Sequence, residues 1–443
     1  MKRFHADSDI DSFIEKAPQN WHIKRLKYVA PIKREKLDKK PEDLTYIGLE
    51  HIEPWIGLLY ESDVEEVKSS VNVFDKGNIL LGKLRPYLAK VIVAPFKGVC
   101  TTELVVLDVN EHINTRFIFY QIISHRFITV LNALSYGVKM PRANPYQIET
   151  MITLIPPIEE QNSIAMFLDL ELSKIDEIIF RYHQFIKFIK EKRFALINHV
   201  VNYGLDPDVQ LVDSGLNWIN IIPEKWKVRK IKYVSERVLT GKTPPSGNPK
   251  YYDQDKINWF GPGDLSDNLI LTESSKKISR NAILDNKAIK FKKFSVLIVG
   301  IGATVGKVGM ITEDSCSNQQ INAIEFDSNI IRPKYGLYYL YGIKEIVANL
   351  ANTSTIPIFN QTQTENLNIL IPPIEEQEEI ITFIDKEMAK MGIMIQKITE
   401  QIDLLKEYKI SLINKAIIGE IDSMGVFDGK SFKNVRGWDG RTS

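Results

Sequence analysis

One seven-residue segment occurs twice in this chain, and it constrains the fold more than any other feature. Ile155-Pro-Pro-Ile-Glu-Glu-Gln161 reappears without change as Ile371-Pro-Pro-Ile-Glu-Glu-Gln377, at an offset of 216 residues. The register continues downstream, where Asp169 corresponds to Asp385. Because the match is long and stays in phase, it predicts that the chain is one unit built twice.

The repeat also extends upstream of these segments. Trp21 corresponds to Trp226, and Cys100 corresponds to Cys316. Elsewhere in this upstream stretch the two copies barely resemble each other. A frame that is kept while its contents differ is expected if both units perform one task on two different targets.

Composition limits the class of protein. With 443 residues the chain has room for two to four domains, and 44% hydrophobic residues is ordinary for a globular protein. The first ten residues lack the apolar core of a signal peptide, and no apolar run is long enough to span a bilayer. We therefore expect a soluble, cytoplasmic protein with no membrane contact. Cys100 and Cys316 are expected to be buried small hydrophobic residues.

The net charge of +1 by itself argues against nucleic-acid binding, because such domains usually carry a basic excess. The charge is unevenly distributed, however. Basic residues exceed acidic ones in the two variable units, and acidic residues exceed basic ones in the repeated segments that follow them. Ordinary surface variation explains this pattern as well as a DNA-contacting surface does, and the latter predicts modest, salt-dependent affinity.

Each repeated segment is predicted to begin a long helix. Two prolines stop the preceding strand, and the glutamates after them place negative charge where the helix dipole favours it. Apolar residues then recur at the three-to-four spacing of a coiled-coil seam. The predicted seam comprises Leu168, Leu172, Ile175, Ile179, Tyr182, Ile186, Ile189, Leu196 and Val200, and Ile384, Met388, Met391, Ile395, Ile398, Ile402, Leu405, Leu412 and Ala416.

Both copies interrupt this seam with a cation, Arg193 in the first and Lys409 in the second. One interpretation is a long side chain that covers the seam while its charge reaches water. The alternative is a charge that fixes the register or binds a partner.

The two helices should pair with each other. Each is expected to span about 46 residues, or roughly 70 Å, and neither can bury its apolar stripe alone. Antiparallel pairing with a globular unit at each end is the simplest solution, and it relates the repeats by a pseudo-twofold axis. The predicted fold class is α+β: two sheet-containing globular domains joined by two long antiparallel coiled-coil helices.

Within the units, several apolar runs read as strands between turns. Examples are residues 45–47, 78–81, 90–94, 294–299 and 321–324. Helices are expected over residues 115–131 and 333–350. Gly204 is expected to cap the first long helix ahead of a connector rich in Asp, Pro, Ser and Gly.

The search for catalytic motifs is mostly negative. Gly300-Ile-Gly-Ala-Thr-Val-Gly-Lys307 resembles a nucleotide-binding loop, but its spacing fits neither a P-loop nor a dinucleotide fingerprint. The histidines and cysteines form no metal-ligand spacing, and no nucleophile elbow occurs. We therefore expect a non-catalytic chain with no metal site, in which Gly300 to Lys307 form a turn that presents Lys307.

The repeated segments and several other motifs resemble those of a known family, the DNA-specificity subunits of type I restriction-modification systems. The Pro-Pro-Ile-Glu-Glu-Gln helices are similar to that family's two repeated helical regions. The stretch from Leu205-Asp-Pro-Asp to Trp226 is similar to its entry into the second recognition domain. Further similar motifs are Tyr46-Ile-Gly-Leu-Glu-His-Ile52, Lys83-Leu-Arg-Pro-Tyr87, Gly241-Lys-Thr-Pro244 and Asn318-Gln-Gln-Ile321.

The resemblance implies that each variable unit is a target recognition domain that reads one half of a split double-stranded DNA site. It also implies that two methyltransferase subunits, and possibly restriction subunits, dock on this chain. S-adenosylmethionine, ATP and Mg are then expected on those partner subunits. The residues expected to serve subunit docking or the spacer are Ile155, Pro156, Pro157, Glu160, Gln161, Ile371, Pro372, Pro373, Glu376 and Gln377.

The expected organisation is linear. Residues 1–154 form the first recognition domain, 155–204 the central spacer helix, 205–370 a linker with the second recognition domain, 371–421 the C-terminal spacer helix, and 422–443 a tail. A spacer of ~70 Å allows a gap of at most about 20 base pairs, and we expect several unspecified base pairs between the half-sites. A four-residue insertion in the first helix should change this gap.

Candidate DNA contacts are cations in turns and amides that could read base edges. They are Lys83, Arg85, Lys90, Lys139, Arg142, Lys242, Lys250, Lys307, Asn318, Gln319 and Gln320. A solvated surface charge remains the alternative for each cation, and a structural hydrogen-bonding role remains the alternative for the Asn-Gln-Gln run.

Two other functions stay open. A non-catalytic protein scaffold predicts no DNA footprint, and an enzyme with a nucleotide at Gly300 to Lys307 predicts nucleotide binding by the isolated chain.

Overall fold

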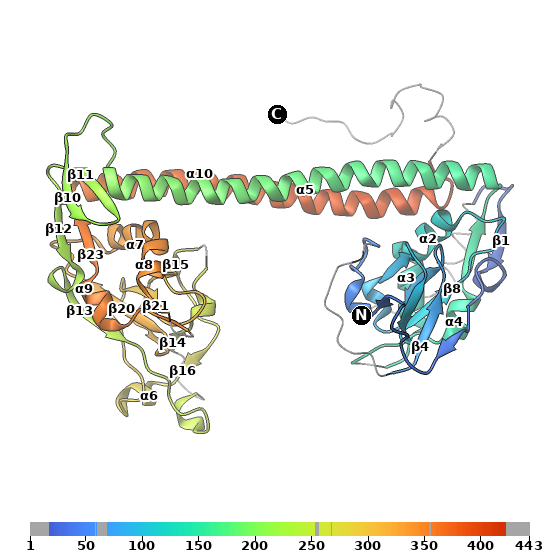
Figure 1. Cartoon of the computed structure of the whole chain (residues 1–443), viewed down its shortest axis with the longest axis horizontal. Helices are drawn as coiled ribbons and strands as arrows, with labels where there is room; N and C mark the ends of the chain where they lie inside the picture. The colour runs from blue at the N-terminus through green and yellow to red at the C-terminus, as the bar shows by residue number, and fades with distance from the viewer. Residues whose placement is uncertain are drawn as a thin grey trace. The chain divides into compact units, whose positions relative to one another are not determined.

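The computed structural model describes residues 17–57, 59, 69–137, 139–252, 257–266, 268–353 and 356–421. The chain divides into two compact units (Figure 1). Within the described residues, unit 1 comprises 17–182 with 400–421, and unit 2 comprises 183–399. Two long helices contribute to both: α5 (Ile158–Tyr203, 46 residues) and α10 (Ile374–Ala416, 43 residues).

Unit 1 contains a four-stranded sheet in the order β2-β4-β7-β3, a three-stranded sheet β6-β5-β8 and the pair β1-β9. Helices α2 and α3 pack with the β5 and β8 side chains in the main core. The element bounds are β1 His22–Arg25, β2 Lys36–Leu37, β3 Tyr46–Ile47, β4 Val71–Phe74, β5 Ile79–Gly82, β6 Val91–Val93, β7 Gly98–Thr101, β8 Leu104–Leu107, α2 Thr115–Ile123, α3 His125–Leu134, α4 Pro145–Thr150 and β9 Ile152–Ile155.

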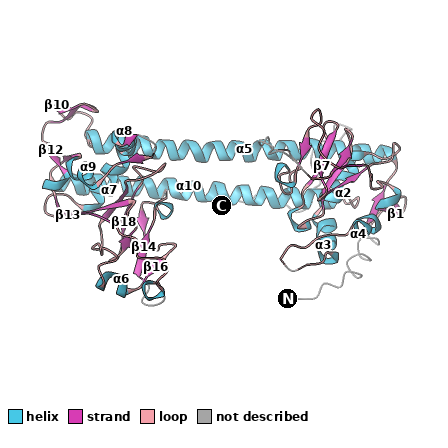
Figure 2. Ribbon diagram, turned by 60° about the horizontal axis from the view of Figure 1, so that its bottom comes forward, coloured by secondary structure: helices cyan, strands magenta, loops and turns pink. Residues whose placement is uncertain are grey.

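Unit 2 contains a five-stranded sheet β13-β20-β17-β18-β15, a three-stranded sheet β16-β14-β19 and three strand pairs. Figure 2 shows the helices α6, α7, α8 and α9 of this unit together with its strands. The pairs are β10-β11, β12-β23 and β21-β22. The element bounds are β10 Leu211–Leu216, β11 Ile219–Pro223, β12 Lys227–Lys230, β13 Ser235–Thr240, β14 Ile257–Phe260, β15 Ile270–Leu271, β16 Lys277–Ile278, α6 Arg280–Leu284, β17 Val296–Val299, β18 Val308–Ile311, β19 Cys316–Ser317, β20 Ile321–Phe326, α7 Pro333–Gly342, α8 Lys344–Leu350, β21 Asn352–Thr353, β22 Pro357–Ile358, α9 Gln361–Asn366 and β23 Asn368–Ile371.

The two long helices run antiparallel, as expected from the sequence. In unit 1, Leu168 and Leu172 of α5 share a buried cluster with Leu412 and Ala416 near the end of α10. In unit 2 the other ends of the two helices meet: Val200 near the end of α5 joins a buried cluster with Ile380 and Ile384 at the start of α10. Every residue of the predicted seam is buried or half-buried, so the coiled-coil prediction is confirmed.

One seam cation is an interhelical ion pair. The amine of Lys409, only 14% exposed, donates to the carboxylate of Asp176 on α5. The Lys409 stem therefore covers the seam, as the first interpretation expects, while its amine makes an interhelical contact of the kind that the register-fixing alternative expects.

The repeated glutamine explains why the Pro-Pro segment occurs twice. In unit 2 the Gln377 side chain is fully buried. Its Nε2 donates to the Pro372 carbonyl (3.0 Å) and to the Ile330 carbonyl (2.9 Å), and its Oε1 accepts from the Arg332 amide (2.9 Å).

Gln161 repeats this arrangement in unit 1, donating to Pro156 (2.8 Å) and accepting from the Asn114 amide (2.9 Å). Both glutamines lock the start of a long helix onto the domain before it. Both are buried and bonded within their own unit, which fits the spacer part of their expected role, and direct docking of subunits stays a prediction for the repeated segments.

A second repeated contact involves the aspartates that follow. Asp169 accepts from Arg116 Nε (3.0 Å) and from the Tyr120 hydroxyl, both on α2. Asp385 accepts from Lys334 Nζ (2.6 Å) and from the Tyr338 hydroxyl, both on α7. Burial, together with the hydrogen bond to Asp385, raises the pKa of Tyr338 far above its usual range. In each unit one aspartate therefore ties the long helix to a helix of the domain.

Removing this hydroxyl should measurably destabilise unit 2. Tyr338→Phe deletes a hydrogen bond to a charged acceptor, so we expect the free energy of unfolding to fall by about 1.5 kcal/mol in urea titrations. Tyr233→Phe is the matched control, since Tyr233 is 62% exposed and should lose almost nothing. Equal effects from the two substitutions would contradict the role given to Asp385.

Most local predictions hold, with two corrections. The expected strands are present, and Gly204 (φ +80°) ends α5 with its amide bonded to the Val200 carbonyl (2.9 Å). The single helix expected over residues 115–131 is wrong, because Ser124 adopts an extended conformation and its hydroxyl accepts from Phe127 N at the start of α3. The helix expected over residues 333–350 is likewise divided at Ile343 into α7 and α8.

Both cysteines lie inside the units. Cys100 on β7 and Cys316 on β19 are free and fully buried, and burial raises the pKa of each thiol to about 12. No single helix among the described residues is long and apolar enough to cross a membrane. The bent pair α2 and α3 meets that test only jointly, by length and composition.

Candidate nucleic-acid interface

Three segments that are distant in sequence meet in unit 1. The Lys83 amide donates to the Glu103 carbonyl (3.0 Å), and the Ala143 amide donates to the Lys83 carbonyl (2.8 Å). The Arg85 amide donates to the Pro141 carbonyl (2.7 Å). These bonds join the loop after β5 (83–90), the turn before β8 (101–103) and the segment 139–143. We call this arrangement the junction of unit 1.

Unit 2 has the same arrangement of backbone bonds. The Gly300 amide donates to the Gln320 carbonyl (2.7 Å), and the Phe359 amide donates to the Gly300 carbonyl (2.7 Å). The Gly302 amide donates to the Pro357 carbonyl (3.1 Å). The loop after β17 (300–307), the turn before β20 (317–320) and the segment 356–359 therefore form the junction of unit 2.

The equivalent backbone positions carry different chemistry. Unit 1 places Lys83, Arg85, Glu103 and Arg142 where unit 2 places Gly300, Gly302, Gln320 and Ile358. At these four positions unit 1 thus carries charged side chains, whereas unit 2 carries neutral ones that include one amide. This difference is what two readers of unlike sequences require.

Positive charge gathers in the junction of unit 1. Arg142 Nη2 forms an ion pair with Glu103 Oε1 (2.8 Å), with 44% and 24% of the two side chains exposed. Lys83 is half-buried. Burial lowers its pKa, and the nearby Arg142 and Lys36 lower it further, while Glu103 opposes them. An incoming anion would relieve this repulsion.

Amide side chains organise the junction of unit 2. Asn318 Nδ2 donates to Gln320 Oε1 (3.1 Å), and Asn318 Oδ1 accepts from the Gln320 amide (3.0 Å). The exposed Gln319 accepts from the Thr243 hydroxyl, and the adjacent Lys242 amide donates to the Ser317 carbonyl (3.0 Å). Asn318 and Gln320 therefore have structural hydrogen bonds, which leaves Gln319 as the exposed amide of the run.

The remaining candidate cations lie in different surroundings. Lys90 Nζ donates to the Leu49 carbonyl (2.6 Å), and Lys250 Nζ pairs with Asp285 (2.7 Å), so each already has a partner within its unit. Among the described residues, no hydrogen bond or ion pair joins the Lys250 side chain to the junction of unit 2. Lys139 and Lys307 are exposed on the junction segments, and the exposed Lys242 is bonded through its amide to the junction of unit 2.

Several backbone amides of the glycine-rich loop are already bonded within unit 2. A phosphate loop needs backbone amides that point freely at the ligand. Here the Gly300 and Gly302 amides are bonded as described, the Gly306 amide donates to the Val299 carbonyl (3.0 Å), and the Lys307 amide donates to the Thr304 carbonyl (3.2 Å). These bonds argue against the alternative of a nucleotide site at Gly300 to Lys307.

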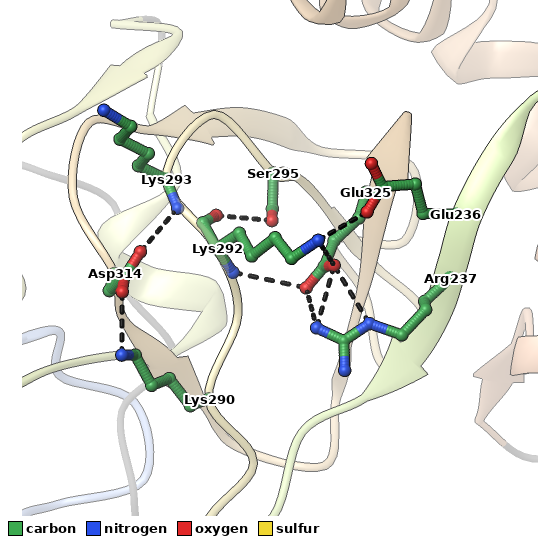
Figure 3. Close-up of polar contacts among 8 residues, drawn as sticks. All are labelled: Glu236, Arg237, Lys290, Lys292, Lys293, Ser295, Asp314 and Glu325. Atoms are coloured by element: carbon green, nitrogen blue, oxygen red, sulfur yellow. Dashed lines mark hydrogen bonds and ion pairs between the residues drawn. The ribbon is translucent and has the colours of Figure 1, made fainter. Parts of the chain in front are cut away.

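A further group of charged residues in unit 2 forms ion pairs and hydrogen bonds within that unit. Figure 3 shows the buried Glu325 accepting from Arg237 Nε (3.0 Å) and from the Lys292 amide (3.2 Å). Asp314 pairs with Lys290 Nζ (2.7 Å). These residues link β13, β20 and the turn before β17. They lie at the opposite end of β17 from the junction, and we exclude them from the candidate interface.

Sequence reasoning missed Glu103, Ile358 and Thr243 as members of the junctions. The signal was present but weak, since Glu103 and Gln320 match at an offset of 217 instead of 216. Because the residues around Glu103 and Gln320 are not similar, only the shared backbone hydrogen bonds show that these two positions are equivalent.

Comparison with known proteins now decides the family. The model of the type I restriction modification DNA specificity domain matches residues 18–179 and 223–404, one match in each half of the chain. The chain belongs to this family. The earlier resemblance is thereby confirmed.

Individual relatives are distant. The chain is 23% identical over 319 residues to the EcoBI specificity subunit of Escherichia coli, covering 70% of this chain and 66% of the relative. It is 31% identical over 154 residues to the EcoDI specificity subunit of Escherichia coli, covering 33% of this chain and 34% of the relative. The matches therefore span less than two-thirds of these relatives' lengths.

A solved structure supports the fold. A chain from a structure titled for complex assembly and conformational transition of the type I R-M system superposes with a TM-score of 0.68 at 19% identity. The match covers 91% of this chain and 99% of that chain. The α+β fold with two sheet-containing domains and long helices is thus shared with this neighbour.

Proposed function

We propose that this chain is the DNA-specificity subunit of a type I restriction-modification complex and recognises a bipartite, asymmetric DNA site. The observation that carries the proposal is the pair of junctions, which share one backbone arrangement and carry unlike side chains. Arginine and lysine suit guanine edges and phosphates, and glutamine and asparagine suit adenine. Each unit then reads one half-site.

The proposed DNA contacts follow from exposure and from membership of the junctions. Lys90 and Lys250 are left out of this set because the Lys90 amine is bonded to the Leu49 carbonyl, outside the junction, and Lys250 pairs with Asp285 and lies outside the junction segments. The side-chain bonds of Arg142, Asn318 and Gln320 join residues of the same junction, so these residues are kept. The proposed contacts are Lys83, Arg85, Lys139 and Arg142 in unit 1, and Lys242, Lys307, Asn318, Gln319 and Gln320 in unit 2.

The long helices are the proposed docking surface for two methyltransferase subunits. Away from the buried seam, both helices expose large apolar side chains, and such residues are favoured at protein interfaces. On α5 these are Met166, Leu170, Ile178, Phe180, Phe185 and Phe188, and on α10 they are Phe383, Ile393, Met394, Leu404, Tyr408 and Ile410. A restriction subunit would join the same assembly.

Catalysis is assigned to these partners. S-adenosylmethionine, ATP and Mg are proposed to bind the partner subunits, and this chain supplies recognition alone, in the cytoplasm where the DNA lies. The names of the relatives, all specificity subunits, support this division of labour. The linear domain limits given above likewise stay a prediction.

Mapping of methylated adenine by single-molecule sequencing tests the proposal. A strain that carries this chain with its methyltransferase subunits is compared with the same strain lacking the chain. We expect one gapped, asymmetric motif to be methylated only when the chain is present. Unchanged methylation after deletion would favour the protein-scaffold alternative.

The length of the helices should set the gap between half-sites. Because α5 and α10 both run from one unit into the other, a heptad inserted after Tyr182 and another after Thr399 keeps the seam in register. Seven residues add about 10 Å, or about three base pairs. Methylation mapping should show a longer gap and unchanged half-sites. Seven exposed substitutions at the same places, without insertion, are the control, and an unchanged gap in the inserted protein would refute the idea.

A further inference from the structure

Three of the backbone positions that lie in the left-handed region in unit 1 correspond to three such positions in unit 2. In unit 1 they are Gly77 (φ +91°), Arg85 (φ +51°) and Ala89 (φ +46°). In unit 2 they are Phe294 (φ +69°), Gly302 (φ +104°) and Gly306 (φ +88°), each 217 residues later. The junction loop therefore keeps one backbone path, which unit 2 builds with glycine at both ends and unit 1 builds without.

Glycine is the residue that this path favours. A side chain in the left-handed region costs about 1 kcal/mol or more, and it persists only where something compensates for the strain. Ala89 is buried, and its methyl group contributes to the main core of unit 1. Arg85 has no comparable structural reason to be there.

The Arg85 side chain makes no contact that would explain its presence. Within the described residues it has no ion pair or side-chain hydrogen bond, and its buried Nε lacks an acceptor. Lys83, two residues away on the same loop, and Arg142, which pairs with Glu103, add positive charge to the same junction. The fold thus accepts strain, and a half-buried guanidinium whose Nε lacks an acceptor, at a position where glycine would serve.

We propose that Arg85 is a specificity-determining residue of unit 1, held in a strained conformation so that its guanidinium meets an acceptor on the first half-site. This inference rests on the proposed function and names one residue that determines specificity for the first half-site. The acceptor is a guanine edge or a phosphate oxygen, both of which suit arginine. In unit 2 the equivalent Gly302 leaves this place open, and the nearest side-chain atom to an added Cβ would be Gln320 Nε2 at 3.8 Å.

The test separates contact from strain by comparing three variants of the chain co-expressed with its methyltransferase subunits. Arg85→Gly removes the side chain and relieves the strain, whereas Arg85→Ala removes the side chain and keeps the strain. Ala89→Gly relieves the strain at the other end of the loop and keeps Arg85. Binding is measured on duplexes carrying the methylated motif of the wild-type complex, and the melting temperature is measured on the purified chain.

We expect Arg85→Gly and Arg85→Ala to weaken binding by about 10- to 100-fold. Arg85→Gly should raise the melting temperature by about 2 °C relative to Arg85→Ala. Ala89→Gly should bind within about threefold of wild type, since the methyl group that it removes is buried in the core of unit 1 and cannot touch DNA. If Arg85 contacts guanine, its removal should relax the sequence preference at one base of the first half-site. If Arg85 contacts a phosphate, its removal should weaken binding to all sequences alike and lower the slope of log affinity against log salt concentration by about one.

Wild-type binding by the Arg85→Gly complex would overturn the inference and leave the proposed function standing. A melting temperature several degrees below wild type for Arg85→Gly would also overturn it, since Arg85 would then be structural. If the wild-type complex methylates no motif, the proposed function itself fails.

Discussion

Replacing Gln377 by alanine should lower the free energy of unfolding of unit 2 by about 3 to 4 kcal/mol. The side chain is fully buried and satisfies three backbone groups, the Arg332 amide and the carbonyls of Ile330 and Pro372. Truncation leaves these groups unpaired in the interior, where each costs about 1 kcal/mol or more, and it adds a cavity.

The measurement is urea unfolding combined with hydrogen exchange of unit 2. Exchange should accelerate first at the start of α10 and around Arg332, because Gln377 joins these two places. Gln401→Ala is the control, an exposed glutamine of the same helix that should change stability by less than about 0.5 kcal/mol. Gln161→Ala should act in the same way on unit 1. A small effect at Gln377 would mean that water replaces the amide and that the repeated motif has another purpose.

Gly306→Ala should cost unit 2 about 2 to 4 kcal/mol. Gly306 has φ +88°, and a Cβ added there would lie 2.5 Å from the Lys344 carbonyl oxygen, which belongs to the backbone at the start of α8. Left-handed strain alone costs about 1 kcal/mol, and unit 1 tolerates such strain at the equivalent residue, Ala89. The larger part of the loss must come from displacing α8.

Thermal and urea unfolding check this prediction against Gly263→Ala. An added Cβ at Gly263 would meet no atom within 4 Å and φ is not positive, so stability should stay nearly unchanged. If Gly306→Ala proves as mild as Gly263→Ala, α8 yields easily and the glycine has to be explained by function. Close packing thus explains Gly306 and also Gly300, where an added Cβ would lie 2.5 Å from the Phe359 carbonyl oxygen, whereas Gly302 is explained by its backbone angle of φ +104°.

The duplicated parts of this chain could be predicted from sequence because repetition exposes them. Gln161 and Gln377 stand in an identical segment, and Asp169 and Asp385 keep its register. The seam followed from apolar periodicity, which depends only on helix geometry. Ser124 broke a predicted helix because its hydroxyl accepts a hydrogen bond that starts the next one, a choice that propensity does not reveal.

The junctions could be predicted only in part. Lys83, Arg85 and Arg142 attracted attention as cations in turn-like sequence, but nothing local shows that residues 83–85 bond to residues 141–143. The strain at Arg85 also could not be predicted, because a positive φ leaves no mark in the sequence unless the residue is glycine. The equivalence of Arg85 with Gly302 therefore emerged only from the two sets of hydrogen bonds.

The division of the chain between its units has a consequence for biosynthesis. Unit 2 is one uninterrupted stretch, 183–399, whereas unit 1 needs residues 400–421 as well. Leu412, Ile413 and Ala416 fill the same core as Trp21. The half of the protein that leaves the ribosome first is thus the last to be completed, and it waits with an uncovered apolar face until the final helical turns arrive.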